Sequence, residues 1–284
     1  MKVPVELEID PEKALSYGIS WVKDYFKKAA IKTAVIGISG GSDSAITAYI
    51  TAKAIGKENV IGVLLPEDEV TPKEDILHGE EVIKDLGINR REINITDIVN
   101  AVIKSDEDLL KIKNRIAYAN IKARIRMVLL YKEANKNNAL VVGTDDRSEH
   151  ILGYYTKYGD GGVDINVPEY IYKTQVRMLL DYIAEKENVL VMKAISAKKP
   201  SPRLWTGQTA EAELDLDYTI IDRIFYYLKD SGEKWGVNQL SAKLGVKDEV
   251  IEKIIQMEKV NMHKDLTPPS PPVINDFNLH GGKK

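Results

Sequence analysis

A turn rich in glycine and serine is the feature of this sequence with the clearest chemistry. Residues 39–44 read Ser-Gly-Gly-Ser-Asp-Ser and follow a short apolar run at 33–39. The two glycines let the backbone approach a ligand closely, and the N–H groups that begin the next helix point towards an anion. The hydroxyl groups of Ser39, Ser42 and Ser44 add donors. The turn therefore predicts a cradle for an anion the size of pyrophosphate.

The same turn contains a carboxylate, Asp43, where a Walker A loop would have a lysine after its glycines. A carboxylate beside phosphates is repulsive unless a cation lies between them, so Asp43 predicts bound Mg²⁺. Glu149 follows a second apolar run at 140–143 and can supply a second carboxylate. The alternatives are a plain turn between a strand and a helix at 39–44, and a solvated helix start at Glu149.

Apolar runs and helical patterns alternate along the first half of the chain. This order predicts an α/β fold with a mostly parallel sheet covered on both faces, in which ligands bind beyond the carboxyl ends of the strands. The loops after Ser39 and Gly143 are therefore expected to form the site. The predicted strands are 33–39, 60–65, 91–95 and 140–143, and the predicted helices are 11–30, one from Ser42, 74–86 and 112–134.

The C-terminal part has a different composition. Helical patterns at 218–228 and 240–260 predict an appendage of helices over about 215–262, followed by a tail rich in Pro, Gly and Lys. We expect one α/β domain over 1–265 and the tail over 266–284.

Bulk composition excludes several classes of function. The net charge of −3 and a pI near 5.9 argue against a nucleic-acid-binding protein. The chain has no cysteine, which rules out thiolate metal sites and a cysteine nucleophile. No run approaches the roughly 18 apolar residues of a membrane span, and no signal peptide is visible at the start, so a cytoplasmic location is expected.

A connection rich in glycine and tyrosine, 153–166, follows the predicted strand at 140–143. Long ordered loops at the end of a sheet commonly carry function. Thr144, Lys157, Asp164 and Lys173 are polar candidates in and around it, and a lysine facing triphosphate oxygens would offset their charge. Taken singly, Lys157, Asp164 and Lys173 each fit an ordinary surface position better than a binding role.

Two levels of resemblance follow from these residues. The turn at 39–44 matches the Ser-Gly-Gly-x-Asp-Ser signature of the PP-loop ATP pyrophosphatases. A more selective set of motifs, found in order between about residues 35 and 265, closely resembles NAD synthetase. These are Thr-Lys-Tyr-Gly-Asp-Gly-Gly-Val-Asp-Ile-Asn at 156–166, Tyr-Lys-Thr-Gln-Val-Arg at 172–177, Asn-Ile-Lys-Ala-Arg-Ile-Arg-Met at 120–127, Pro-Ser at 200–201 with Leu-Trp-Thr-Gly-Gln-Thr at 204–209, and His-Lys at 263–264.

The resemblance implies a fold and a reaction. The fold would be a Rossmann-like, doubly wound parallel sheet of the adenine nucleotide alpha hydrolase type with C-terminal helices. The reaction would be the amidation of deamido-NAD, the last step of NAD biosynthesis: the nicotinate carboxylate attacks the α-phosphate of ATP, pyrophosphate leaves, and ammonia displaces AMP from the adenylated intermediate. Ammonia is expected because glutamine-dependent members use a further domain with a cysteine nucleophile. The resemblance also implies a homodimer with the dinucleotide site near the interface.

Individual residues are assigned by motif. Asp43 and Glu149 would bind Mg²⁺ and act in catalysis with Lys173. Deamido-NAD would contact Arg124, Lys157, Asp164, His263 and Lys264. ATP would contact Gly37, Ile38, Ser39, Gly40, Gly41, Ser42, Asp43, Ser44, Thr144, Lys173 and Ser201.

The sequence departs from the family pattern at several positions. Asp145 and Asp146 stand where a neutral pair is usual, and Arg203, Ala210 and Ala212 are also atypical. Arg126 points about 200° away from Arg124 around a helix and is interpreted as structural. The alternative interpretations are another PP-loop amidase similar to GMP synthetase, and a nucleotide-binding module without catalysis. The pairing of Asp43 with Glu149 argues against the second.

Overall fold

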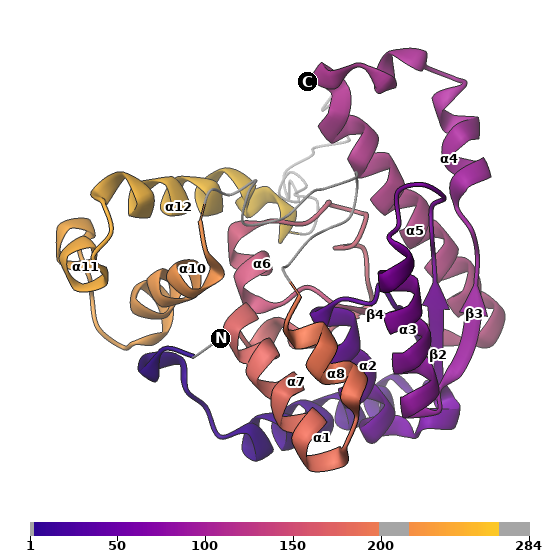
Figure 1. Cartoon of the computed structure of the whole chain (residues 1–284), viewed down its shortest axis with the longest axis horizontal. Coiled ribbons are helices and arrows are strands. Elements are labelled where there is room, and N and C mark those ends of the chain that lie inside the picture. The colour runs from indigo at the N-terminus through magenta and orange to yellow at the C-terminus, as the bar shows by residue number, and fades with distance from the viewer. Residues whose placement is uncertain (1–2, 199–215, 267–284) are drawn as a thin grey trace, which may run out of the picture.

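The computed structural model describes residues 3–198 and 216–266. Its centre is a parallel sheet with the strand order β3-β2-β1-β4-β5 (Figure 1). The chain winds outward from β1 to β3 and then returns to place β4 beside β1, so the winding reverses between these two strands. The predicted α/β class and parallel sheet are confirmed. The strands are β1 (Thr33–Gly37), β2 (Val60–Leu64), β3 (Asn89–Glu92), β4 (Ala139–Gly143) and β5 (Ile165–Asn166).

Alternating side chains of the central strands enter two different hydrophobic cores. Ala34 and Ile36 of β1 pack with one set of helices, and Val35 between them packs with another. Because successive residues of a strand face opposite sides, a strand buried on both sides reads as a continuous apolar run. The first set comprises α1 (Pro11–Ala29), α2 (Ser42–Ile55), α3 (Lys73–Leu86), α7 (Lys173–Glu187) and α8 (Leu190–Ser196), and the second comprises α4 (Thr96–Ile103) and α5 (Arg115–Asn137).

The C-terminal helices build a third core with α6 (Arg147–Leu152). Leu152 of α6 and Tyr172 are buried against α10 (Tyr218–Phe225), α11 (Val237–Leu244) and α12 (Asp248–Asn261). Figure 1 shows these helices on the side of the molecule opposite to β3. The helical pattern predicted over 240–260 is present as two helices, because Gly245 takes a φ of 68° and ends α11 before α12 begins.

Other boundaries differ by a few residues. The helix predicted from 112 begins with a 3₁₀ turn at Ile112–Asn114 before α5, and the one predicted over 218–228 continues from α10 as a π-helical turn at Tyr226–Asp230. Across 3–198 and 216–266, none of the helices combines the length and the apolar composition needed to cross a membrane.

Candidate active site

A cavity of about 270 Å³ lies beyond the carboxyl ends of β1 and β4, where the winding reverses. The loop after β1 and the loop after β4 both line it, as the sequence predicted. Most residues expected to bind ATP also line it: residues 37–39 and 41–44, Thr144 and Lys173. Gly40 does not line the cavity and instead packs against the backbone of Asp75 in α3. Ser201 lies outside the described residues.

Hydrogen bonds of the Ser44 hydroxyl group stabilise the backbone conformation of the turn at 39–44. The Ser44 Oγ accepts a hydrogen bond from the Ser39 amide at 3.2 Å and donates one to the Gly41 carbonyl at 3.1 Å. Helix α2 begins at Ser42, within the segment 39–44, so the positive end of its dipole faces the cavity. Gly40 takes a φ of +73°, and a Cβ there would lie 2.0 Å from the carbonyl oxygen of Asp75. Only glycine fits this backbone path.

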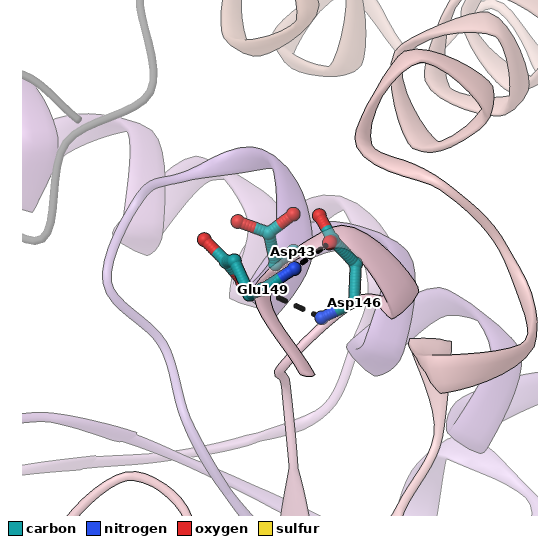
Figure 2. A group of neighbouring side chains, drawn as sticks. All are labelled: Asp43, Asp146 and Glu149. Atoms are coloured by element: carbon teal, nitrogen blue, oxygen red, sulfur yellow. Dashed lines mark hydrogen bonds between the residues drawn. The ribbon is translucent and has the colours of Figure 1, made fainter. Parts of the chain in front are cut away.

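Four charged side chains meet on one wall of the cavity. The Lys173 Nζ, which is completely buried, lies 2.9 Å from Asp43 Oδ2, 2.8 Å from Asp146 Oδ2 and 2.8 Å from Glu149 Oε1. Figure 2 shows the three carboxylates gathered together, one from the start of α2 and two from the start of α6. The structure brings Asp43, Glu149 and Lys173 into contact, as predicted. Their roles in metal binding and catalysis stay a prediction.

Burial and crowding shift the protonation of this cluster. Burial raises the pKa of Glu149 well above its usual value; Asp146, Asp43 and Asp145 add to that rise, and Lys173 opposes it. Burial likewise raises the pKa of Asp146, again against the effect of Lys173. Burial acts to lower the pKa of Lys173, but the three carboxylates outweigh it and hold that pKa well above its usual value. One ammonium group is therefore shared by three acids.

Asp146 is a member of this cluster that was not predicted from the sequence. Its Oδ1 accepts a hydrogen bond from the Glu149 amide at 3.0 Å, and the Glu149 Oε2 accepts one from the Asp146 amide at 3.4 Å. This reciprocal capping box fixes the first turn of α6 and aims both side chains at Lys173. The spacing Asp-x-x-Glu is visible in the sequence and could have indicated it. The family pattern, which favours a neutral residue here, obscured it.

The donor set fits a magnesium ion. Carboxylate oxygens of Asp43, Asp146 and Glu149 lie within 4.8 Å of one another. Mg²⁺ prefers such hard oxygen ligands and takes few of them from protein, leaving positions for phosphate and water. When all three acids are ionised, three negative charges against the one positive charge of Lys173 leave an excess of two, which a divalent cation would balance.

We expect Asp146→Asn to weaken metal binding without unfolding α6. Asparagine caps a helix about as well as aspartate but lacks the charge. The Mg²⁺ concentration needed for half-maximal activity should rise about 10-fold. The matched control is Asp217→Asn, which changes the N-cap of α10, where Asp217 accepts from the Thr219 amide. An Mg²⁺ titration of Asp146→Asn that overlays the wild-type curve would remove Asp146 from the metal site.

Four of the five residues predicted to bind deamido-NAD lie together in the structure, and the fifth, Asp164, lies elsewhere. Lys157 donates to the His263 carbonyl, and Lys264 donates to the Tyr155 carbonyl at 2.9 Å, so these three predicted residues meet at the 153–162 loop. Arg124 joins them through the Lys157 carbonyl at 3.4 Å. Asp164 lies apart, with its carboxylate accepting from the Val141 amide at 2.7 Å and from a tyrosine hydroxyl. None of these residues lines the described cavity.

Arg126 was interpreted as structural from its helical spacing, and its side chain forms part of the cavity wall. Spacing from Asn120 identifies the helix face of Arg124 and does not show which face meets the site. The structure shows that the opposite face of α5 borders the cavity through Ala123, Met127 and Leu130.

Comparison with known proteins identifies the family of this chain. The family model described as NAD synthase matches residues 14–268. The NH(3)-dependent NAD(+) synthetase of Staphylothermus marinus is 41% identical over 265 residues, which cover 93% of each chain. Two solved structures share the fold: NMN synthetase from Francisella tularensis (TM-score 0.77, 29% identity, 94% of this chain and 100% of that one) and NH3-dependent NAD synthetase from Campylobacter jejuni in complex with nitrate (TM-score 0.73, 26% identity, 93% and 100%). This chain belongs to the NAD synthase family.

Proposed function

We propose that the protein is an ammonia-dependent NAD synthetase, a ligase that uses ATP to convert deamido-NAD into NAD. The observation that carries this proposal is the meeting of an anion-binding turn with the buried cluster of Lys173 and three carboxylates in one cavity. The family match and the relative from Staphylothermus marinus support the choice of reaction. A GMP-synthetase-like amidase and a module without catalysis are not favoured by either.

The chemistry assigned to the cavity follows from the groups that line it. A carboxylate reacts poorly with an amine, and transfer of an adenylyl group to it creates a good leaving group. The amides and hydroxyls of residues 39–44 would bind the β- and γ-phosphates that depart as pyrophosphate. Lys173 would place its positive charge beside them. Asp43, Asp146 and Glu149 would hold Mg²⁺, which neutralises phosphate charge when bound.

Deamido-NAD is assigned to the 153–162 loop and the end of α12. Lys157, His263 and Lys264 converge there, which offers positive charge to a dinucleotide diphosphate. Arg124 extends the same surface. Asp164 is assigned to deamido-NAD, and Ser201 to ATP, by their motifs alone. A cytoplasmic location is part of the proposal, since ATP is supplied in that compartment.

The products made from each nitrogen donor test the proposal. With ATP, Mg²⁺, deamido-NAD and ammonium, we expect NAD, AMP and pyrophosphate to form in equal amounts. Glutamine should replace ammonium hardly at all, because the chain has no cysteine to release ammonia from it. Chromatography of the nucleotides and a pyrophosphate assay measure all three products. ADP with orthophosphate would contradict the proposed bond cleavage.

A second candidate substrate is nicotinate mononucleotide, favoured by the likeness to NMN synthetase from Francisella tularensis. The same amidation would then give NMN. We expect deamido-NAD to have the higher kcat/KM by at least about 10-fold, because a dinucleotide can use more binding contacts. Parallel assays with the two substrates separate the candidates, and the reverse order of kcat/KM would favour the mononucleotide.

We further propose that the protein is a homodimer formed through α5. Large apolar side chains at and before its start are unusually exposed: Ile112 is 89% and Ile116 is 69% exposed. Further along, Val128 borders a groove lined by Ile98, Ile121, Arg124, Ile125 and Leu129. A long helix with such a face is suited to a second copy in a two-fold arrangement, in which the same patch meets itself. Arg124 on this face would bring the dinucleotide site near the interface.

Charge placed on this face should separate the subunits. We expect the double variant Ile116→Lys with Val128→Lys to sediment as a monomer, while the wild type sediments as a dimer. Leu77→Lys on α3 is a matched control, since Leu77 and Val128 are each 57% exposed. Analytical ultracentrifugation measures the mass. A wild-type monomer, or a double variant that stays dimeric, would contradict the proposed interface.

A further inference from the structure

The side chain of Arg126 lines the cavity, and no binding or catalytic role above includes it. It comes from the middle of α5, on the opposite side of the helix from Arg124. Its helix neighbours Ala123, Met127 and Leu130 also border the cavity, whereas Arg124 borders the groove on the far side. The two arginines of the Ala-Arg-Ile-Arg segment therefore face two different environments.

The hydrogen bonding of Arg126 is incomplete. Its Nε donates to the carbonyl oxygen of Leu65 at 3.3 Å, just beyond the end of β2. A guanidinium group has five N–H donors, so this bond anchors the side chain and uses one of them. Within 3–198 and 216–266, Arg126 forms no ion pair with a carboxylate. The four N–H groups of its two terminal nitrogens remain for a ligand.

The electrostatic setting of Arg126 is that of a binding group. Burial lowers the pKa of Arg126, while the more distant charges of Glu67 and Asp160 act in the opposite direction. An arginine nevertheless stays protonated in proteins, so its charge is carried into the cavity. Glu67 is already paired with Lys122, at 2.7 Å and nearly completely buried. The Arg126 side chain is partly buried and has no direct acid partner among the described residues, so an anionic ligand would compensate its charge.

The other two cations that line the cavity form ion pairs with carboxylates, whereas Arg126 does not. Lys173 is shared by three carboxylates, and Lys198 pairs with Asp75 and donates to the Gly40 carbonyl at 3.2 Å. Of the three cations that line the cavity in the described chain, Arg126 alone forms no ion pair with an acid. Its guanidinium group is a planar fork of N–H donors. Such a fork matches the paired oxygens of a phosphate or a carboxylate.

We propose that Arg126 is a substrate-binding residue that contacts anionic oxygens of the nucleotide held in this cavity. The proposal rests on the proposed function for the identity of the substrates. The shared chemistry is a phosphate or carboxylate group, and two substrates can supply it: ATP and the dinucleotide. Leu65 positions the guanidinium by accepting from Nε, and the two terminal nitrogens bind the ligand.

The test compares Arg126→Gln with Arg126→Lys. We expect Arg126→Gln to lower kcat/KM by about 10- to 100-fold, as the loss of a charge-assisted hydrogen bond would. Arg126→Lys should recover only part of this, because it keeps the charge but not the fork. The matched control is Lys136→Gln, which removes one positive charge from the exposed end of the same helix.

Separate measurements of KM identify the ligand. A raised KM for ATP assigns the contact to ATP, a raised KM for deamido-NAD assigns it to the dinucleotide, and a fall in kcat alone assigns it to the transition state. Calorimetric titration with Mg²⁺-ATP alone tests the site even if the wild type were to turn over neither dinucleotide nor mononucleotide. The proposal is overturned if Arg126→Gln loses thermal stability while kcat, both KM values and ATP affinity stay within twofold of wild type. It is equally overturned if Arg126→Gln is indistinguishable from Lys136→Gln.

Discussion

Lys173→Met will lower kcat/KM by about 100- to 1000-fold, the usual effect of removing one group that stabilises developing charge. It will also lower the free energy of unfolding by about 3–5 kcal/mol near neutral pH, because the buried Asp146 and the partly buried Asp43 and Glu149 will lie together without their cation. Methionine preserves the length and the packing of the side chain. Steady-state kinetics and urea unfolding in metal-free buffer measure the two effects.

The pH dependence of this loss has a defined sign. Without Lys173, the folded-state pKa values of Asp146 and Glu149, which burial already raises, should rise further. An acid with a raised folded-state pKa destabilises the protein increasingly as pH rises above its unfolded-state pKa, near 4. The stability deficit of Lys173→Met should therefore shrink as pH falls towards that value. Lys186→Met, on the exposed part of α7, is the control, and equal losses in the two variants would contradict the account.

Among the described glycines, Gly40→Ala is expected to be the most damaging substitution by alanine. Gly40 takes a φ of +73°, and the new Cβ would lie 2.0 Å from a backbone oxygen of α3, which cannot move aside cheaply. The turn or α3 must shift, and the amides of residues 39–44 would lose their alignment. We expect the affinity for ATP to fall more than about 100-fold, since misplacement by about 1 Å has costs of this size.

Gly232→Ala is a control that measures the cost of the left-handed backbone conformation without the steric clash expected at Gly40. Gly232 has almost the same φ, +74°, but no atom lies within 4 Å of the position that a Cβ would take there. Gly232→Ala should cost about 1–2 kcal/mol of stability and leave ATP affinity within twofold of wild type. Calorimetry with Mg²⁺-ATP and thermal unfolding measure both variants. If the two changed ATP affinity equally, the close approach of α3 to the turn would not matter for binding.

The central strands were predictable because they are buried on both faces. Strands β1, β2 and β4 read as apolar runs, and each lies within one residue of its predicted start. The prediction for β3 was displaced to 91–95, because all four residues of the strand are exposed and the buried Ile95 lies after it. Two-residue β5 was not predicted, since so short a strand has no period to detect.

The grouping of the candidate-site residues in one cavity was predictable where a residue type alone implies chemistry. The glycines and hydroxyls of 39–44 indicated the cradle, and Asp43 with Glu149 indicated a cation. Asp146 was not predicted because the family pattern favours a neutral residue at its position, although its capping-box spacing to Glu149 is visible in the sequence. The position of Arg126 in the cavity wall was not predicted, because the sequence gives the angle between two residues on a helix and not which face meets the cavity.

The most direct test of the whole account is a crystal structure with Mg²⁺ and an ATP analogue whose α–β bridge is a methylene group. We predict that the β- and γ-phosphates contact the amides of residues 39–44 and that the metal contacts Asp43, Asp146 and Glu149. A triphosphate bound elsewhere, with this turn free of phosphate and the three carboxylates free of metal, would contradict the account.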